Sequence, residues 1–161
     1  MTAIYWFSGT GNSYSVAMRI AAACGDAQLI PLARGADAAA PDAERVVFVF
    51  PVYAFGPPPN VAEFLQNVPV AAGAYVCAVM TYDSMPGGCA RVTRSILRKR
   101  GVSLDAAFGV AMPGNYPPFG GAKRKEKTDR KNARAGEKVE DIAAAVARGE
   151  QGMFGGNTPV I

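Results

Sequence analysis

The sequence contains no histidine and only three cysteines. Without an imidazole, the chain cannot carry a His-based catalytic triad or His-based acid–base chemistry. An odd number of cysteines with no Cys-x-x-Cys pair predicts neither a disulfide framework nor a zinc or iron–sulfur site. Cys24 and Cys77 lie in apolar patterns, and Cys89 lies near a predicted helix start, where a thiolate would be favoured. We expect all three to be packing residues.

Long apolar runs are also missing from the sequence. None approaches the roughly 18 residues that a membrane-spanning helix needs. Met1 leads into a strand pattern, not into a charged segment followed by a cleavage site. The sequence therefore predicts a cytoplasmic protein with no membrane span. Half of the residues are hydrophobic and 19% are charged, which predicts a globular chain. Its length of 161 residues predicts a single domain over residues 1–161.

Apolar runs alternate with helical patterns along the chain. This alternation predicts repeated βαβ units, and thus an α/β fold with a doubly wound parallel sheet and helices on both faces. The run Val46-Val47-Phe48-Val49-Phe50 is apolar at every position, as expected of a central parallel strand. The predicted strands are residues 2–7, 27–32, 45–50, 74–81 and 106–112. Apolar stripes at helical spacing mark four helices between and after them.

Three segments allow further local predictions. Residues 35–42 stand where the second crossover would carry a helix, but their Ala, Asp and Pro content predicts a short or irregular connection. Asn60, with Glu63 three residues later, predicts the N-cap of the second helix. Residues 149–161 are Gly-rich without periodicity, so we expect this segment to pack loosely.

The segment Ser8-Gly9-Thr10-Gly11-Asn12-Ser13 follows the first predicted strand and leads into a helical pattern. Its glycines let the backbone approach an anion, its polar side chains donate hydrogen bonds, and a helix N-terminus favours negative charge. It has no lysine, unlike the triphosphate-binding loop, and Tyr14 stands where the dinucleotide motif needs a third glycine. The segment therefore favours a terminal phosphate monoester such as that of FMN. An ordinary strand-to-helix turn is the alternative.

Further Gly- and Pro-rich loops follow the third, fourth and fifth predicted strands. Ligands of doubly wound sheets bind outside the carboxyl ends of the strands, where these loops meet. Tyr53, Phe55 and Tyr82 lie on them, and such aromatic side chains can stack on a flat ring. Anchoring of the loops to the core is the alternative role of these rings. Asn115 and Tyr116 are candidates to cover the same pocket.

The loops Ser8-Gly9-Thr10-Gly11-Asn12-Ser13, Tyr53-Ala54-Phe55-Gly56 and Thr81-Tyr82 resemble those of the flavodoxin family. The segments Phe50-Pro51-Val52-Tyr53-Ala54-Phe55-Gly56-Pro57-Pro58 and Met112-Pro113-Gly114-Asn115-Tyr116 look more closely like the flavodoxin-like domain of flavodoxin–ferredoxin fusion proteins. The Cys-rich ferredoxin half of those proteins is not in this sequence. The resemblance implies a five-stranded sheet in the order 2-1-3-4-5 and a non-covalent FMN.

The resemblance also implies which residues hold the FMN. By position, the phosphate would be bound by Ser8, Thr10, Gly11, Asn12 and Ser13. The isoalloxazine would be flanked by Pro51, Val52, Tyr53, Ala54, Phe55 and Gly56 of one loop and by Thr81, Tyr82, Asp83, Gly87 and Gly88 of the next. In the family, a peptide of the first flanking loop reorients toward the reduced flavin. The Phe55–Gly56 peptide is the candidate here.

The charge of the chain departs from the family pattern. Flavodoxins are typically acidic, whereas this chain has a net charge of +4. Between Lys123 and Arg134 lie seven basic and two acidic residues, which account for the whole excess. A solvated helix face is one interpretation, and docking to an acidic redox partner or iron–sulfur domain is the other. No recognised nucleic-acid motif accompanies the segment, so we do not expect nucleic acid as a partner.

Together these features predict an FMN-binding electron-transfer protein that shuttles electrons between redox partners. Two alternatives remain at the level of sequence. An NAD(P)H-dependent flavin or quinone reductase would need donors for a 2′-phosphate, for which Arg34 is a weak candidate. A flavin-free binding module of the same fold would have an empty pocket.

Overall fold

Six strands form one parallel sheet within residues 1–113 and 122–154, the part of the chain that the computed structural model describes. They are β1 (Thr2–Trp6), β2 (Ala27–Pro31), β3 (Arg45–Pro51), β4 (Tyr75–Tyr82), β5 (Ala106–Ala111) and β6 (Gly152–Phe154). Their order is β2-β1-β3-β4-β5-β6. The first five strands confirm the predicted order 2-1-3-4-5, and their ends lie within one residue of the predicted bounds.

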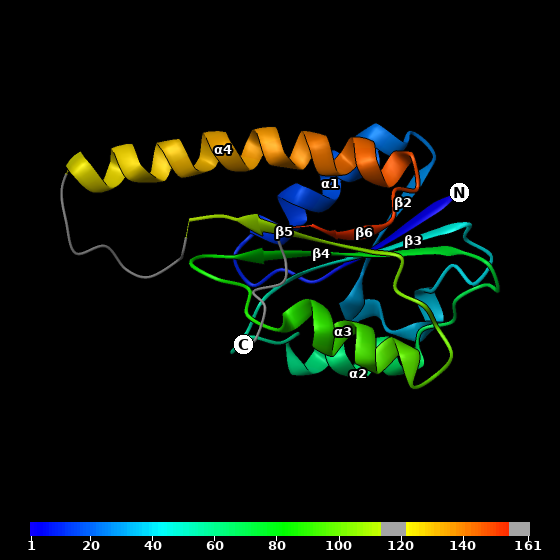
Figure 1. Cartoon of the computed structure of the whole chain (residues 1–161). Helices are drawn as coiled ribbons and strands as arrows, with labels where there is room; N and C mark the ends of the chain where they lie inside the picture. Colours follow the sequence, from blue (N-terminus) through cyan, green and yellow to red (C-terminus); the bar gives the residue numbers. More distant parts are fainter. Residues whose placement is uncertain (114–121, 155–161) are drawn as a thin grey trace.

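Helices cover both faces of this sheet (Figure 1). They are α1 (Asn12–Cys24), α2 (Pro59–Asn67), α3 (Cys89–Arg98) and α4 (Ala122–Ala147). Apolar residues of α1 and α4 pack on one face, and those of α2 and α3 pack on the other. Because side chains alternate along a strand, β3 contributes to both cores. Its residues Val46, Val47, Phe48, Val49 and Phe50 are at most 1% exposed, which confirms the central strand.

The crossover from β2 to β3 carries two 3₁₀ turns, η1 (Leu32–Arg34) and η2 (Ala36–Ala38), in place of an α-helix. This confirms the prediction of a short or irregular connection. The hydroxyl oxygen of Tyr5, in β1, accepts a hydrogen bond from the Ala40 N–H at 2.9 Å. That contact fixes the irregular segment against the core, where burial raises the pKa of Tyr5.

Two predictions about element ends are wrong. Asn60 does not cap α2, which begins at Pro59 with Pro58 in the N-cap position. Proline suits the first helical position because its φ is already helical and its missing N–H would have no intrahelical partner. The prediction that residues 149–161 pack loosely is also wrong for residues 152–154. They form β6, which pairs with residues 106–108 of β5. A three-residue strand is too short to leave a periodic signal; residues 155–161 lie outside the described part.

The cysteines are packing residues, as predicted. Cys77 and Cys89 are buried, and Cys24 is partly buried against the core between the sheet and α1. Burial raises the pKa of Cys89 to about 12, so its thiol stays protonated near neutral pH despite its place at the start of α3. Within the described residues, no helix is both long and apolar enough to traverse a bilayer.

Candidate functional site

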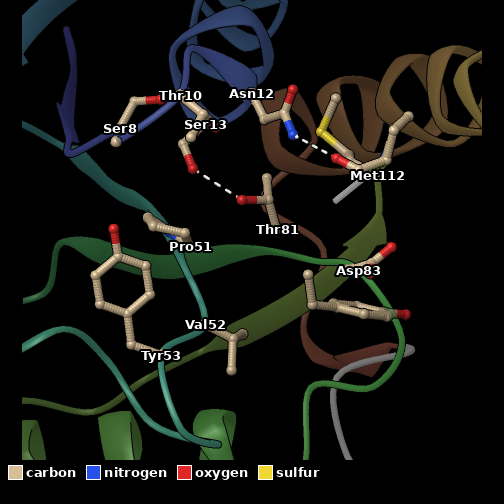
Figure 2. A pocket seen from close by; sticks show the side chains of 13 residues that line it. Ser8, Thr10, Asn12, Ser13, Pro51, Val52, Tyr53, Thr81, Asp83 and Met112 are labelled. Carbon is tan, nitrogen blue, oxygen red and sulfur yellow. Dashed lines mark hydrogen bonds between the residues drawn. The ribbon is translucent and has the colours of Figure 1, made fainter. Parts of the chain in front are cut away.

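Four loops meet around a cavity of about 130 Å³ at the carboxyl ends of β1, β3, β4 and β5 (Figure 2). The chain runs outward from β1 to β2 and then returns to β3, so the cavity lies at the switch in strand order where doubly wound sheets bind ligands. The lining residues are Ser8, Gly9, Thr10, Asn12, Ser13, Pro51, Val52, Tyr53, Thr81, Tyr82, Asp83, Met112 and Pro113. They include no lysine or arginine.

The loop after β1 presents unpaired hydrogen-bond donors. Gly11 takes φ +95° at the N-cap of α1, and no side chain within the described residues caps that helix. The N–H groups of the first helical turn therefore lack intrahelical partners. The Ser8 hydroxyl oxygen accepts a hydrogen bond from the Gly11 N–H at 2.9 Å, which leaves the Ser8 hydrogen available to an anion. This chemistry fits a phosphate group.

Two side chains of the same loop are tied to other parts of the rim (Figure 2). The hydroxyls of Ser13 and Thr81 are hydrogen-bonded at 2.8 Å, and the Asn12 amide donates to the Pro113 carbonyl at 3.2 Å. Only one hydroxyl hydrogen is used between Ser13 and Thr81, so the pair retains a donor for a ligand. Asn12 uses one amide hydrogen to bind the segment after β5. Its side chain therefore positions that segment, a role that its sequence context did not indicate.

Tyr53 lies over the phosphate loop. A Cβ atom built on Gly9 would come within 2.9 Å of the Tyr53 hydroxyl oxygen, so a larger residue at position 9 would displace the end of the Tyr53 side chain. The Tyr53 ring meets the Phe7 ring edge-on, with centroids 6.3 Å apart. It nevertheless remains 46% exposed. A partly exposed ring held in this way can form one wall of a site for a flat ligand.

The loop after β3 closes in a tight turn. The Tyr53 N–H donates to the Gly56 carbonyl at 2.9 Å, and the Gly56 N–H donates back to the Tyr53 carbonyl at 3.0 Å. Ala54 and Phe55, between them, take φ +48° and +64°, the signs of a type I′ turn. The expected mobile peptide, Phe55–Gly56, already donates its N–H within this turn. The central Ala54–Phe55 peptide takes part in neither of these two bonds, and the reorientation of Phe55–Gly56 stays a prediction.

Phe55 connects this turn to the loop after β4. Its ring lies directly over Gly87, where an added Cβ would come within 2.6 Å of a ring carbon. Gly87 also has φ +54°, a conformation that favours glycine. Phe55 and Gly87 therefore hold two rim loops together without lining the cavity themselves. The other predicted site residues outside the lining are Gly11, Ala54, Gly56 and Gly88.

The loop after β4 brings Tyr82 and Asp83 to the cavity. Burial of the Tyr82 ring raises the pKa of its hydroxyl. The Asp83 carboxylate pairs with the ammonium group of Lys131, which also donates to the Asp83 carbonyl. Lys131 belongs to α4, so this contact brings the basic segment to the rim of the site.

Sequence reasoning named ten of the lining residues and missed Gly9, Met112 and Pro113 as site members. Gly9 stands inside the phosphate motif, and Met112-Pro113 opens a segment quoted for the family resemblance, so both signals were present. Lys131 had no such signal, because its partner Asp83 is 48 positions away. Asn115 and Tyr116, proposed to cover the pocket, lie outside the described residues.

The chain matches no protein-family model and no curated protein. Solved structures do resemble it. Flavodoxin 2 from Bacillus cereus has 18% identity and a TM-score of 0.61, over 91% of this chain and 97% of that one. The Fusobacterium nucleatum flavodoxin bound to flavin mononucleotide has 14% identity and a TM-score of 0.56, over 88% and 95%.

A longer protein also matches. Rubredoxin oxygen:oxidoreductase from Desulfovibrio gigas has 19% identity and a TM-score of 0.59 over 91% of this chain. This chain spans only 35% of that protein's length. At such low identities the similarities bear on the fold, and they agree with the strand order and the helix layers described above. The chain therefore has the flavodoxin-like fold.

Proposed function

We propose that this protein binds FMN and carries electrons between redox partners. The observation that supports this most strongly is the loop after β1, where hydroxyl groups and the uncapped first turn of α1 converge on one cavity without a cationic side chain. Such a donor set suits a single terminal phosphate better than a triphosphate. When bound, FMN would supply the redox chemistry, and the protein would supply binding, orientation and control of access.

Each part of the cavity has a task in this proposal. Ser8, Thr10 and the N–H groups at the start of α1 would bind the phosphate. Tyr53 and Tyr82 would flank the ring. The cavity is smaller than the roughly 300–1,000 Å³ of sites that enclose a small-molecule ligand. A flavin would therefore keep an edge at the surface, where a redox partner can reach it.

Arg34, the sequence candidate for binding a 2′-phosphate, lies in η1 and is not among the residues that line the cavity. The proposal therefore favours an electron carrier over an NAD(P)H-dependent reductase. The two differ in a simple assay, because a reductase oxidises NAD(P)H steadily in the presence of a flavin or quinone acceptor. A carrier lacking its partners does not.

The decisive experiment is a flavin titration. The purified protein is stripped of any bound flavin and titrated with FMN and, in parallel, with riboflavin, while visible absorption and flavin fluorescence are recorded. We expect FMN to bind at least about tenfold more tightly than riboflavin, since hydrogen bonds to a charged phosphate contribute roughly 1.5–3 kcal/mol each. No uptake of FMN at micromolar concentration would refute the proposal. Equal affinity for the two ligands would show that the phosphate is not bound in this loop.

A further inference from the structure

The basic residues of α4 gather on one flank of the helix. Lys127, Arg130, Lys131 and Arg134 follow the i, i+3, i+4, i+7 spacing that places side chains on a common face. With Ala111, at the end of β5, they line a hollow beside the carboxyl edge of the sheet. We call these four residues the basic flank. Ala111 directly precedes Met112 and Pro113, which line the proposed FMN cavity, so the hollow adjoins the rim of that cavity.

One member of the basic flank is held at this rim. Lys131 is only partly exposed, and its ammonium group contacts both the carboxylate and the carbonyl of Asp83. The other three members, Lys127, Arg130 and Arg134, are exposed and form no ion pair within the described residues. The contact of Lys131 thus joins this part of α4 to the loop after β4, while three cations without an ion pair remain available to a partner.

The charges of α4 also indicate what kind of partner fits. The acidic residues of the helix border the basic flank, with Glu126 and Asp129 beside its first members and Glu137, Glu140 and Asp141 in the turns that follow Arg134. An extended polyanion, such as a nucleic acid or an anionic membrane, would meet these carboxylates together with the basic flank and would be repelled by them. A protein with a confined acidic patch could contact the basic flank alone.

We propose that the basic flank is the docking surface for an acidic electron-transfer protein that exchanges electrons with the bound flavin. This inference rests on the proposed FMN-binding function. In the exchange, the reduced partner loses one electron and the bound flavin gains it. Docking at the basic flank places the partner beside the cavity rim, at the carboxyl edge of the sheet, over which the N-terminal half of α4 extends (Figure 1).

The test uses the full chain loaded with FMN and a reduced acidic bacterial-type ferredoxin as the probe. The variant Lys127→Gln/Arg130→Gln/Arg134→Gln removes three charges of the basic flank and keeps the Lys131 contact with Asp83. Its matched control, Arg94→Gln/Arg98→Gln/Lys99→Gln, removes three charges from α3 and the residue after it, which lie on the other side of the sheet. Both variants have the same net charge, so steering by net charge alone would affect them equally.

Flavin reduction is followed by stopped flow at low and high ionic strength. We expect the basic-flank variant to react about tenfold or more slowly than the wild type at low salt, and to lose most of the salt dependence. The α3 control should stay within about twofold of the wild type. Equal rates for the two variants, whether both slow or both unchanged, would overturn the docking proposal while leaving FMN binding intact. A wild-type protein that takes up no FMN would overturn the proposed function, and the docking proposal with it.

Discussion

The hydroxyl groups of Ser13 and Thr81 form a buried hydrogen bond of 2.8 Å between the start of α1 and the end of β4. Their residues are 1% and 3% exposed. The bond gives both buried hydroxyls a partner, leaves one hydroxyl hydrogen for a ligand, and fixes the phosphate loop relative to the loop after β4. A site held in place in this way needs little ordering when its ligand binds.

Removing one partner of this bond should cost more than removing both. Ser13→Ala or Thr81→Val alone leaves a buried hydroxyl or a cavity, and we expect each to lower the free energy of unfolding by about 1–3 kcal/mol. The double variant should lose less than the sum of the two, because no polar group is then left without a partner. Urea unfolding of the four proteins measures this coupling. Strictly additive losses would show that the bond does not form in solution.

Thr10 tests the phosphate loop without disturbing that bond. Its side chain is exposed and lines the cavity, so Thr10→Ala should leave the free energy of unfolding nearly unchanged. We expect it to weaken FMN binding by roughly 10–100-fold, the effect of one hydrogen bond to a charged group. Riboflavin affinity should not change, and Thr10→Ser should restore most of the FMN affinity. An equal loss for both ligands would place Thr10 at the ring and not at the phosphate.

The sheet and the phosphate loop could be predicted because their signals are local. The apolar β3 run and the helical stripes are periodic, and Ser8–Ser13 combines turn and donor residues in one short segment. The turn at Ala54-Phe55 could not be predicted, since type I′ turns favour Asn-Gly or Gly and these two residues adopt positive φ against their own preference. Strain of this kind is common at functional sites.

Contacts between segments that are far apart in the sequence could not be predicted either. The pairing of Lys131 with Asp83 depends on the relative position of α4 and the loop after β4, which no short motif encodes. Sequence reasoning identified a basic segment and offered an acidic partner as its role, but it could not place the segment beside the cavity. The structure supplies that placement through Ala111 and Asp83.

The buried thiols should make the protein less stable in alkali. Burial raises the pKa of Cys89 from 9.0 to about 12, and it also raises the pKa of Cys77. In the unfolded chain these thiols ionise near pH 9, whereas in the folded protein they stay protonated, so ionisation favours unfolding. Stability is therefore fully present below pH 9 and falls as the pH rises toward 12, by up to about 1.4 kcal/mol per pH unit for each thiol.

Urea unfolding at pH 8 and pH 10 checks this expectation. Cys89→Ala removes one titrating group, so its stability should fall less steeply between the two pH values than that of the wild type. Its stability at pH 8 should be lower by the cost of the lost packing, which is a separate effect. If the two proteins show the same pH dependence, the Cys89 thiol is not protected from ionisation in the folded state.

Gly87 and Phe55 offer a test of how the rim loops are held together. Gly87→Ala should destabilise the protein for two reasons: the left-handed conformation costs an L-residue about 1–2 kcal/mol, and the new Cβ would collide with the Phe55 ring. Gly73 is the matched control, since it also has positive φ, at +78°, but has open space around it. Gly73→Ala therefore isolates the backbone cost. We expect Gly87→Ala to be the more destabilising by about 1 kcal/mol or more, within the range seen for overpacked sites.

The double variant Phe55→Gly/Gly87→Ala separates the collision from the conformation. The atoms nearest to an added Cβ at position 87 are the Phe55 Cβ and two of its ring carbons, and Phe55→Gly removes all three. Adding Gly87→Ala to Phe55→Gly should therefore cost only about as much as Gly73→Ala does alone. FMN affinity, measured on the same proteins, should fall in Gly87→Ala because the loops after β3 and β4 are forced apart at the rim. If Gly87→Ala costs the same with and without the Phe55 ring, the ring does not rest on Gly87, and the two loops are held together by some other contact.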